Sequence, residues 1–78
     1  MRYDFKPVGN NVLLKLHKEN AFISERGGVN IYEVTKTNNP KLKGKLVIFD
    51  MEFQPVMLDN DIYLAYEDTI RVILEPLN

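Results

Sequence analysis

The sequence predicts an all-β domain, and three observations lead to this expectation. Apolar and polar residues alternate with a period of two over residues 45–50, 62–66 and 70–74, which is typical of strands with two distinct faces. No stretch keeps the i, i+3, i+4, i+7 spacing of a sizeable helix. Turn-forming residues recur about every 8–12 positions, which indicates a small barrel or sandwich.

The first half of the chain is expected to form two strands joined by a loop. Residues 1–11 make an extended segment that ends in the turn-forming Gly9-Asn10-Asn11. Val12 to Lys18 alternates and is predicted to be a strand. Glu19 to Gly28 is polar and ends in glycines, which predicts a loop. Val29 to Thr37 is rich in β-branched and aromatic residues and is predicted to be the second strand.

The second half is expected to hold four short strands. Pro55 weakens the second of these, because proline cannot donate to a ladder and favours an edge or a bulge. The elements follow in order: a tight connection at Thr37–Pro40, a strand at Lys45–Asp50, a weaker strand at Phe53–Leu58, a hairpin turn at Asp59–Asp61, a strand at Ile62–Tyr66, a corner at Glu67–Thr69 and a last strand at Ile70–Glu75.

Composition narrows the classes of function. The 78 residues form one domain, residues 1–78, which is marginally stable alone because a chain this short buries roughly 60% of its unfolded surface. There is no Cys and a single His17, so we expect neither a metal site nor a catalytic residue, and no enzyme. Ten basic and eleven acidic residues give a net charge of −1, which argues against nucleic-acid binding.

The chain also lacks the signals of membrane insertion and export. No apolar run approaches the roughly 18 residues that span a bilayer. The N-terminal residues Met1–Pro7 have no apolar stretch of the kind found in signal peptides. A cytoplasmic location without membrane contact is therefore the expectation.

The predicted loop contains an apolar pair in polar surroundings. Phe22 and Ile23 stand between charged, amide and glycine residues, and exposed large apolar side chains often mark a partner site. The alternative is that the pair folds back and plugs one end of a barrel, since Phe and Ile are usually buried.

Both chain ends carry apolar residues that could pair with another copy. Terminal strands with free edges can extend a neighbouring subunit's sheet; the alternative is that they pair within one chain. The expected interface residues are Tyr3, Phe5, Val8, Val72, Ile73, Leu74 and Leu77.

Three segments resemble the GroES-type co-chaperonins, also called the chaperonin-10 family. Residues 5–15, Phe-Lys-Pro-Val-Gly-Asn-Asn-Val-Leu-Leu-Lys, are similar to the family's opening turn and apolar strand. Lys43-Gly44-Lys45-Leu46-Val47-Ile48-Phe49 resembles its Val-Gly-Asp-x-Val-x-Phe strand, with Lys45 in place of the acid. Residues 61–73 resemble its closing strand, acidic corner and final strand.

The resemblance implies a small GroES-like β-barrel that assembles into a ring, a heptamer in the family. Such a ring caps a GroEL-type chaperonin and assists protein folding. It needs no cofactor of its own, because the chaperonin partner uses the ATP. The chain is shorter than family members, and the difference falls at Thr37–Pro40, where the family has a roof hairpin. Such a compact form would suit a bacteriophage.

The family binds its chaperonin through a mobile loop with a Gly-Gly-Ile-Val-Leu-like motif, and two placements compete here. In one, Gly27-Gly28-Val29-Asn30-Ile31 is the match, with polar Asn30 at the usually apolar centre. In the other, Arg26-Gly27-Gly28-Val29 opens the strand that follows the loop, and Phe22-Ile23 is the anchor. Ala21 is counted with the partner-binding residues of the loop. The second placement keeps every strand of the barrel. A stand-alone β-barrel adaptor, in a virion or a regulatory complex and without a chaperonin partner, is the main rival function.

Overall fold

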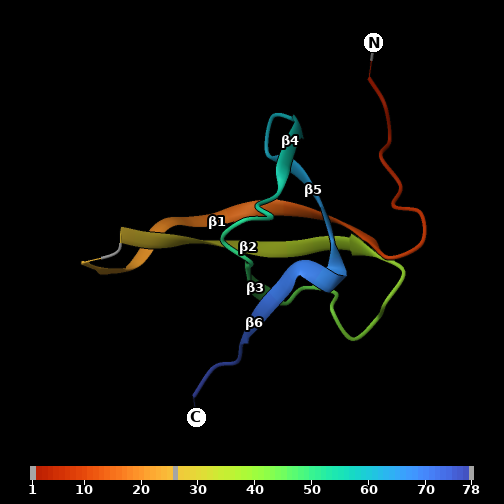
Figure 1. Cartoon of the computed structure of the whole chain (residues 1–78). Coiled ribbons are helices and arrows are strands. Elements are labelled where there is room, and N and C mark those ends of the chain that lie inside the picture. The colour runs from red at the N-terminus through yellow and green to blue at the C-terminus, as the bar shows by residue number, and fades with distance from the viewer. Residues whose placement is uncertain (1, 26, 78) are drawn as a thin grey trace.

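A computed structural model of the chain describes residues 2–25 and 27–77, without the side chains of Ile23 and Ser24. It holds six strands and one short 3₁₀ turn (Figure 1). These elements are β1 Asn11–Ser24, β2 Gly27–Thr37, β3 Leu46–Phe49, β4 Val56–Asp59, β5 Ile62–Tyr66, the turn η1 Glu67–Thr69 and β6 Ile70–Leu74.

The strands form a single antiparallel sheet in the order β4-β5-β1-β2-β3-β6. The all-β prediction is confirmed, and strands lie at all the predicted places. The predicted strand at Phe53–Leu58 is shorter at its start, because β4 begins at Val56, directly after Pro55. The strand therefore begins where backbone N–H groups become available again.

The sheet is curled, and the connection from β5 to β6 requires this. Three strands lie between β5 and β6 in the sheet order, so a flat sheet would separate them by roughly 19 Å. The three residues of η1 link them directly, and such a link spans at most about 14 Å. Two backbone hydrogen bonds fasten the curl, from Asp50 N–H to the Thr69 carbonyl at 2.9 Å and from Glu67 N–H to the Asn10 carbonyl at 2.9 Å.

The inner face of the curled sheet holds the core. Its buried members are Val12, Leu14, Tyr32, Val34, Leu42, Val47 and Phe49. As the period-two alternation indicates, Val12 and Leu14 share one face of β1, and Val47 and Phe49 share one face of β3. The Tyr32 ring packs edge-on against the rings of Phe49 and Tyr63, with centroids 5.8 and 5.2 Å apart, an arrangement that aromatic rings favour. Leu42 comes from the connection after β2, which therefore closes one side of the core.

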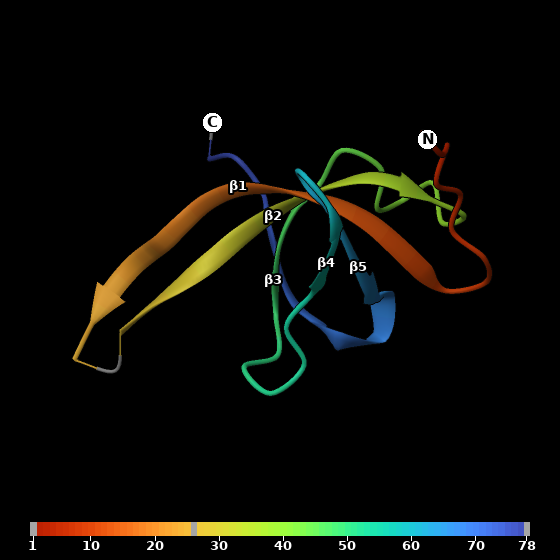
Figure 2. The ribbon, with the colours of Figure 1, turned by 90° about the horizontal axis from the view of Figure 1, so that it is seen from above.

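The predicted loop over Glu19–Gly28 is wrong as secondary structure. β1 continues through Ser24 and β2 starts at Gly27, so this segment is a β-hairpin (Figure 2). Ala21 pairs with Val29, and Ser24 pairs with Gly27. A strand made mostly of polar residues shows no alternation of apolar and polar side chains, so the sequence pattern does not reveal it. Its backbone N–H and C=O groups can still pair with a neighbouring strand.

Candidate partner-binding site

The outer part of the β1–β2 hairpin forms an arm that extends beyond the rest of the sheet, as both ribbon views show (Figures 1 and 2). We define the arm as residues 17–25 and 27–31, the part beyond the paired Leu16 and Tyr32. Within the sheet, β1 pairs with β5 only over Asn11–Leu14. In the arm it pairs with β2 alone, and a two-stranded hairpin is only marginally stable by itself.

The structure separates the predicted loop residues into two groups. Ala21 and Ile31 are 4% and 5% exposed, so their side chains are already covered by their own chain. Phe22 is 66% exposed, and Gly27 is exposed as well. Gly28 and Val29 are half-buried in β2. The side chain of Ile23 lies outside the described residues, so Phe22 is the large apolar side chain that the described arm offers to a partner.

The last strand and the C-terminal residues behave as the sequence predicts for a free edge. β6 pairs with β3 on one side, and the described residues give it no neighbour on the other. Val72 and Ile73 point to opposite faces and are both exposed, while Leu74 is half-buried and Leu77 is fully exposed. Extended backbone groups and apolar side chains are thus available along β6.

The N-terminal segment is extended but lies outside the sheet of its own chain. Tyr3 and Val8 are exposed, whereas Phe5 is half-buried and lines a shallow hollow with Leu13, Leu58 and Leu64.

Polar contacts from the end of β2 hold this segment. Lys36 Nζ donates to the Asp4 carboxylate at 2.7 Å and to the Phe5 carbonyl at 2.9 Å. Asn38 Nδ2 donates to the carbonyls of Pro7 and Gly9 at 3.1 and 3.2 Å. The hydrogen bond and the charge of Lys36 hold the pKa of the Asp4 carboxyl below its ordinary value.

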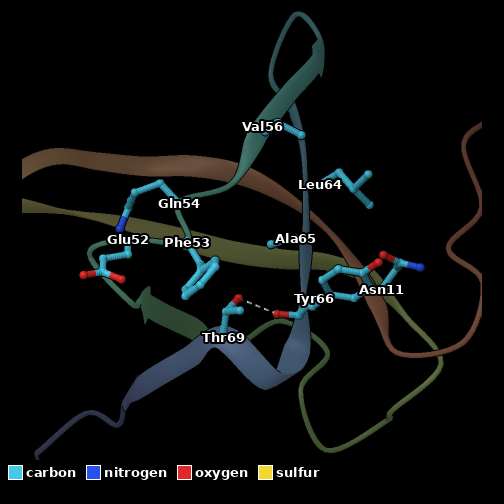
Figure 3. Close-up of a pocket in the computed structure, with 9 residues that line it drawn as sticks. All are labelled: Asn11, Glu52, Phe53, Gln54, Val56, Leu64, Ala65, Tyr66 and Thr69. Carbon is cyan, nitrogen blue, oxygen red and sulfur yellow. Dashed lines mark hydrogen bonds between the residues drawn. The ribbon is translucent and has the colours of Figure 1, made fainter.

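A second apolar surface, which the sequence pattern did not predict, lies over the open side of the curl. It surrounds a hollow of about 330 Å³ between the Glu52–Val56 segment, β5 and Thr69 (Figure 3). Figure 3 shows the ring of Phe53 between Gln54 and Thr69. Glu52 is the one charged residue among those that line the hollow, which suits an apolar occupant. Phe53 and Val56, which line the hollow, are 59% and 57% exposed.

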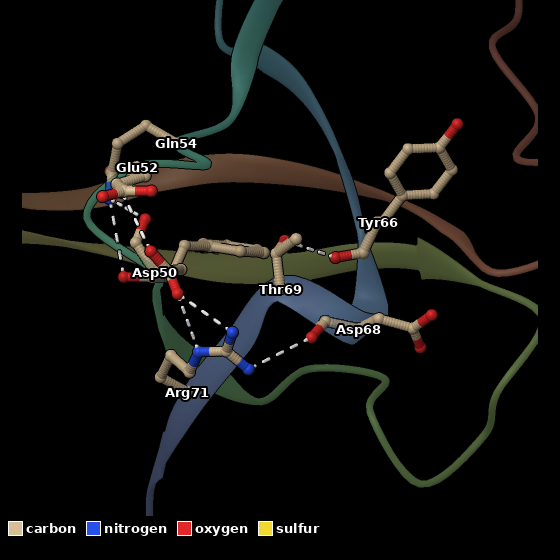
Figure 4. A network of polar contacts seen from close by, with 8 residues as sticks. Asp50, Glu52, Gln54, Tyr66, Asp68, Thr69 and Arg71 are labelled. Atoms are coloured by element: carbon tan, nitrogen blue, oxygen red, sulfur yellow. Dashed lines mark hydrogen bonds and ion pairs between the residues drawn. The ribbon is translucent and has the colours of Figure 1, made fainter.

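Asp50 fixes the segment that carries this surface (Figure 4). Its carboxylate accepts hydrogen bonds from Glu52 N–H at 2.9 Å and from Arg71 Nε at 3.0 Å. Its carbonyl accepts one from Gln54 Nε2 at 2.8 Å. The Glu52 N–H, and next the Arg71 guanidinium, hold the pKa of Asp50 below its ordinary value. No sequence spacing rule connects Asp50 to Arg71, because the antiparallel pairing of β3 with β6 brings them together.

Two further classes of feature are absent from the described part of the chain. It contains no group of three His, Cys, Asp or Glu side chains close enough to hold a metal ion. The same residues form no helix long and apolar enough to cross a membrane.

No protein-family model, curated protein or solved structure matches the chain. The fold and the arm therefore define its class: a small all-β domain with one curled antiparallel sheet, two free sheet edges among the described residues and a projecting hairpin.

Proposed function

We propose that the chain is a compact co-chaperonin of the GroES type. In this proposal, several copies form a ring of curled, barrel-like sheets in the cytoplasm, and the ring caps a GroEL-type chaperonin through its arms. The observation that carries the proposal is Phe22, a large apolar side chain that is 66% exposed on a hairpin projecting from the sheet. Exposed apolar groups of this size tend to mark partner sites.

The two ends of the chain support the proposed ring. The N-terminal segment lies above the sheet and the segment after β6 below it in Figure 1, and the two segments stay well apart in Figure 2. An N-terminal segment that pairs with β6 of the next copy thus makes a head-to-tail contact, and such contacts form a ring when the rotation between successive copies closes. Tyr3, Val8, Val72 and Ile73 are the exposed apolar residues that this pairing would cover. A heptamer is the size that the sequence resemblance implies.

Weak contacts from several arms would add up to a stable but reversible lid. Burying the Phe22 side chain in an apolar groove contributes on the order of 2 kcal/mol per subunit, less the loss of freedom on binding. A ring multiplies such contacts through effective concentration. Each contact alone stays weak enough to break when the chaperonin's nucleotide cycle changes the groove.

The first test is the mass of the purified protein in solution, measured by native mass spectrometry. The proposal expects a ring of several copies, and deletion of residues 1–6 should convert it to monomers. A monomeric wild-type chain, or a truncated chain that keeps the ring mass, contradicts the proposed assembly.

The second test measures binding to a GroEL-type chaperonin with ADP present, together with assisted refolding of a denatured client. Phe22→Ser should leave fold and mass unchanged and abolish both activities. Met57→Ser is the matched control, because Met57 is 60% exposed and lies on β4, away from the arm. Binding that survives Phe22→Ser, or falls equally in both variants, contradicts the role of the arm. Unfolding by Phe22→Ser would show that Phe22 is a core residue instead.

A stand-alone β-domain adaptor is the second candidate. The apolar surface around Phe53 and Val56 favours it, because a lid that binds through its arms does not require that surface. A monomer that fails to bind the chaperonin, and whose binding to another protein is abolished by Phe53→Ser, would support the adaptor.

A further inference from the structure

The backbone of the arm makes an unusual turn at residues 20–22. Asn20 and Phe22 both have positive φ angles, of 50° and 53°. Ala21 between them is buried, and the β1–β2 register shifts on both sides of it. The strand therefore bulges here, and we call residues 20–22 the arm bulge.

Phe22 is an unexpected residue at its position in the arm bulge. The left-handed region is unfavourable for residues with a bulky side chain, whereas asparagine and glycine tolerate it. Burial could offset this strain, but Phe22 is exposed to 66%. Neither the backbone nor the packing of this chain thus favours phenylalanine. A strained backbone at a residue whose side chain does not pack in the core points to a role in binding.

Two residues of β2, the strand paired with the arm bulge, restrict the backbone position of the bulge. A Cβ atom on Gly28 would lie 2.8 Å from the backbone Cα and carbonyl carbon of Asn20, so only glycine fits without moving that backbone. The side-chain oxygen of Asn30 accepts a hydrogen bond from Asn20 N–H at 3.2 Å. Gly28 and Asn30 therefore fix where residue 20 sits, and with it the direction in which Phe22 leaves the strand.

We infer that the arm bulge is a preformed display for Phe22, and that Gly28 and Asn30 are its positioning residues. This inference rests on the proposed lid function and names the contact at that site: one aromatic ring inserted into an apolar pocket of the chaperonin. Because the arm is already a paired hairpin, binding has to order fewer residues than it would in an open loop.

The strain is tested first, with Phe22→Asn, which replaces the residue by one that accepts the left-handed conformation. Amide hydrogen exchange in the arm should slow by about three- to tenfold, since relief of strain stabilises the paired state. Affinity for a GroEL-type chaperonin with ADP should fall below detection. Asp61→Asn is the control, because Asp61 also has a positive φ but lies in the β4–β5 turn; both readouts should stay unchanged. Faster exchange in Phe22→Asn would show that Phe22 supports the fold and would overturn the inference.

The positioning role is tested by variants that keep Phe22. Gly28→Ala should lower chaperonin affinity at least tenfold while circular dichroism and solution mass stay the same. Asn30→Ala should lower affinity several-fold, and Asn30→Asp, which keeps the acceptor oxygen, should restore it.

The outcomes separate the inference from the function on which it rests. Loss of binding in Phe22→Ser with full binding in Gly28→Ala leaves the lid function standing and overturns the display. A wild-type chain that does not bind the chaperonin overturns both.

Discussion

The strand β1 runs through two regions of the molecule that are stabilised by different interactions. Over Val12–Leu14 it is paired on both sides and all three side chains are buried. Beyond Leu16 it pairs only with β2, and residues 17–20 are all exposed. The sheet body is therefore stabilised by a shared core, and the arm mainly by the hydrogen bonds of a hairpin. The weakly held region is the one that presents Phe22, in keeping with the tendency of binding segments to be locally less stable.

The largest contrast should come from truncating one apolar residue in each region. Leu14→Ala removes a fully buried side chain from the core and should lower the free energy of unfolding by about 3 kcal/mol. Val29→Ala in the arm should lower it by less than about 1 kcal/mol. Urea denaturation followed by circular dichroism measures both. Equal losses would mean that arm and body unfold as one packed unit.

The connection after β2 should contribute to the stability of the sheet body. Leu42 is buried with the core residues although it lies outside any strand. Leu42→Ala should lower the free energy of unfolding by about 2 kcal/mol, because a residue at the border of a core leaves a cavity that can partly collapse. Lys43→Ala, one position along and exposed, should stay within about 0.5 kcal/mol of wild type. A smaller effect at Leu42 than at Lys43 would place this connection outside the core.

A smaller, pH-dependent contribution should come from Asp50, which ties the segment after β3 to Arg71. The pKa of Asp50 is lowered in the folded protein, so the stability that it contributes is present above its unfolded-state pKa of about 4. That stability is lost as the pH falls through the lower folded-state pKa. Melting temperatures between pH 6 and pH 2 should therefore fall less steeply for Asp50→Asn than for wild type. The control Asp61→Asn, in the exposed β4–β5 turn, should show the same dependence of melting temperature on pH as wild type. If Asp50→Asn also shows the wild-type dependence, Asp50 does not contribute to the stability in this way.

The smallest effect on stability should come from removing the arm. Leu16 and Tyr32 are paired, so residues 17–31 can be replaced by the two-residue turn Asn-Gly. The free energy of unfolding should change by no more than about 1 kcal/mol, because the core cluster lies outside the arm. Chaperonin binding should be lost while the solution mass per ring falls only by the excised residues. Unfolding of this variant would show that the body depends on the arm.

The fold class and the places of the strands outside the arm could be predicted from the amino-acid sequence. Period-two alternation is a local property, and it reports which face of a strand is buried wherever that strand lies on a core. Val47 and Phe49 share one face, as do Tyr63 and Ala65, in agreement with their spacing; the packing of the folded chain decides that these are the inner faces. The exposed edge at Val72 and Ile73 could also be expected, since both faces of β6 are apolar.

The features that depend on contacts between distant segments could be found only in the folded chain. The arm is a hairpin because backbone pairing needs no apolar pattern, so the polar run over Glu19–Gly28 carries no strand signal. Leu42 is buried because it packs with core residues from several strands. The Asp50–Arg71 ion pair forms because β3 pairs with β6, which lies more than 20 positions further along the chain. The left-handed backbone at Asn20 lies where Gly28 approaches it closely from the other strand of the hairpin. Such contacts are set by three-dimensional packing, which a one-dimensional pattern does not contain.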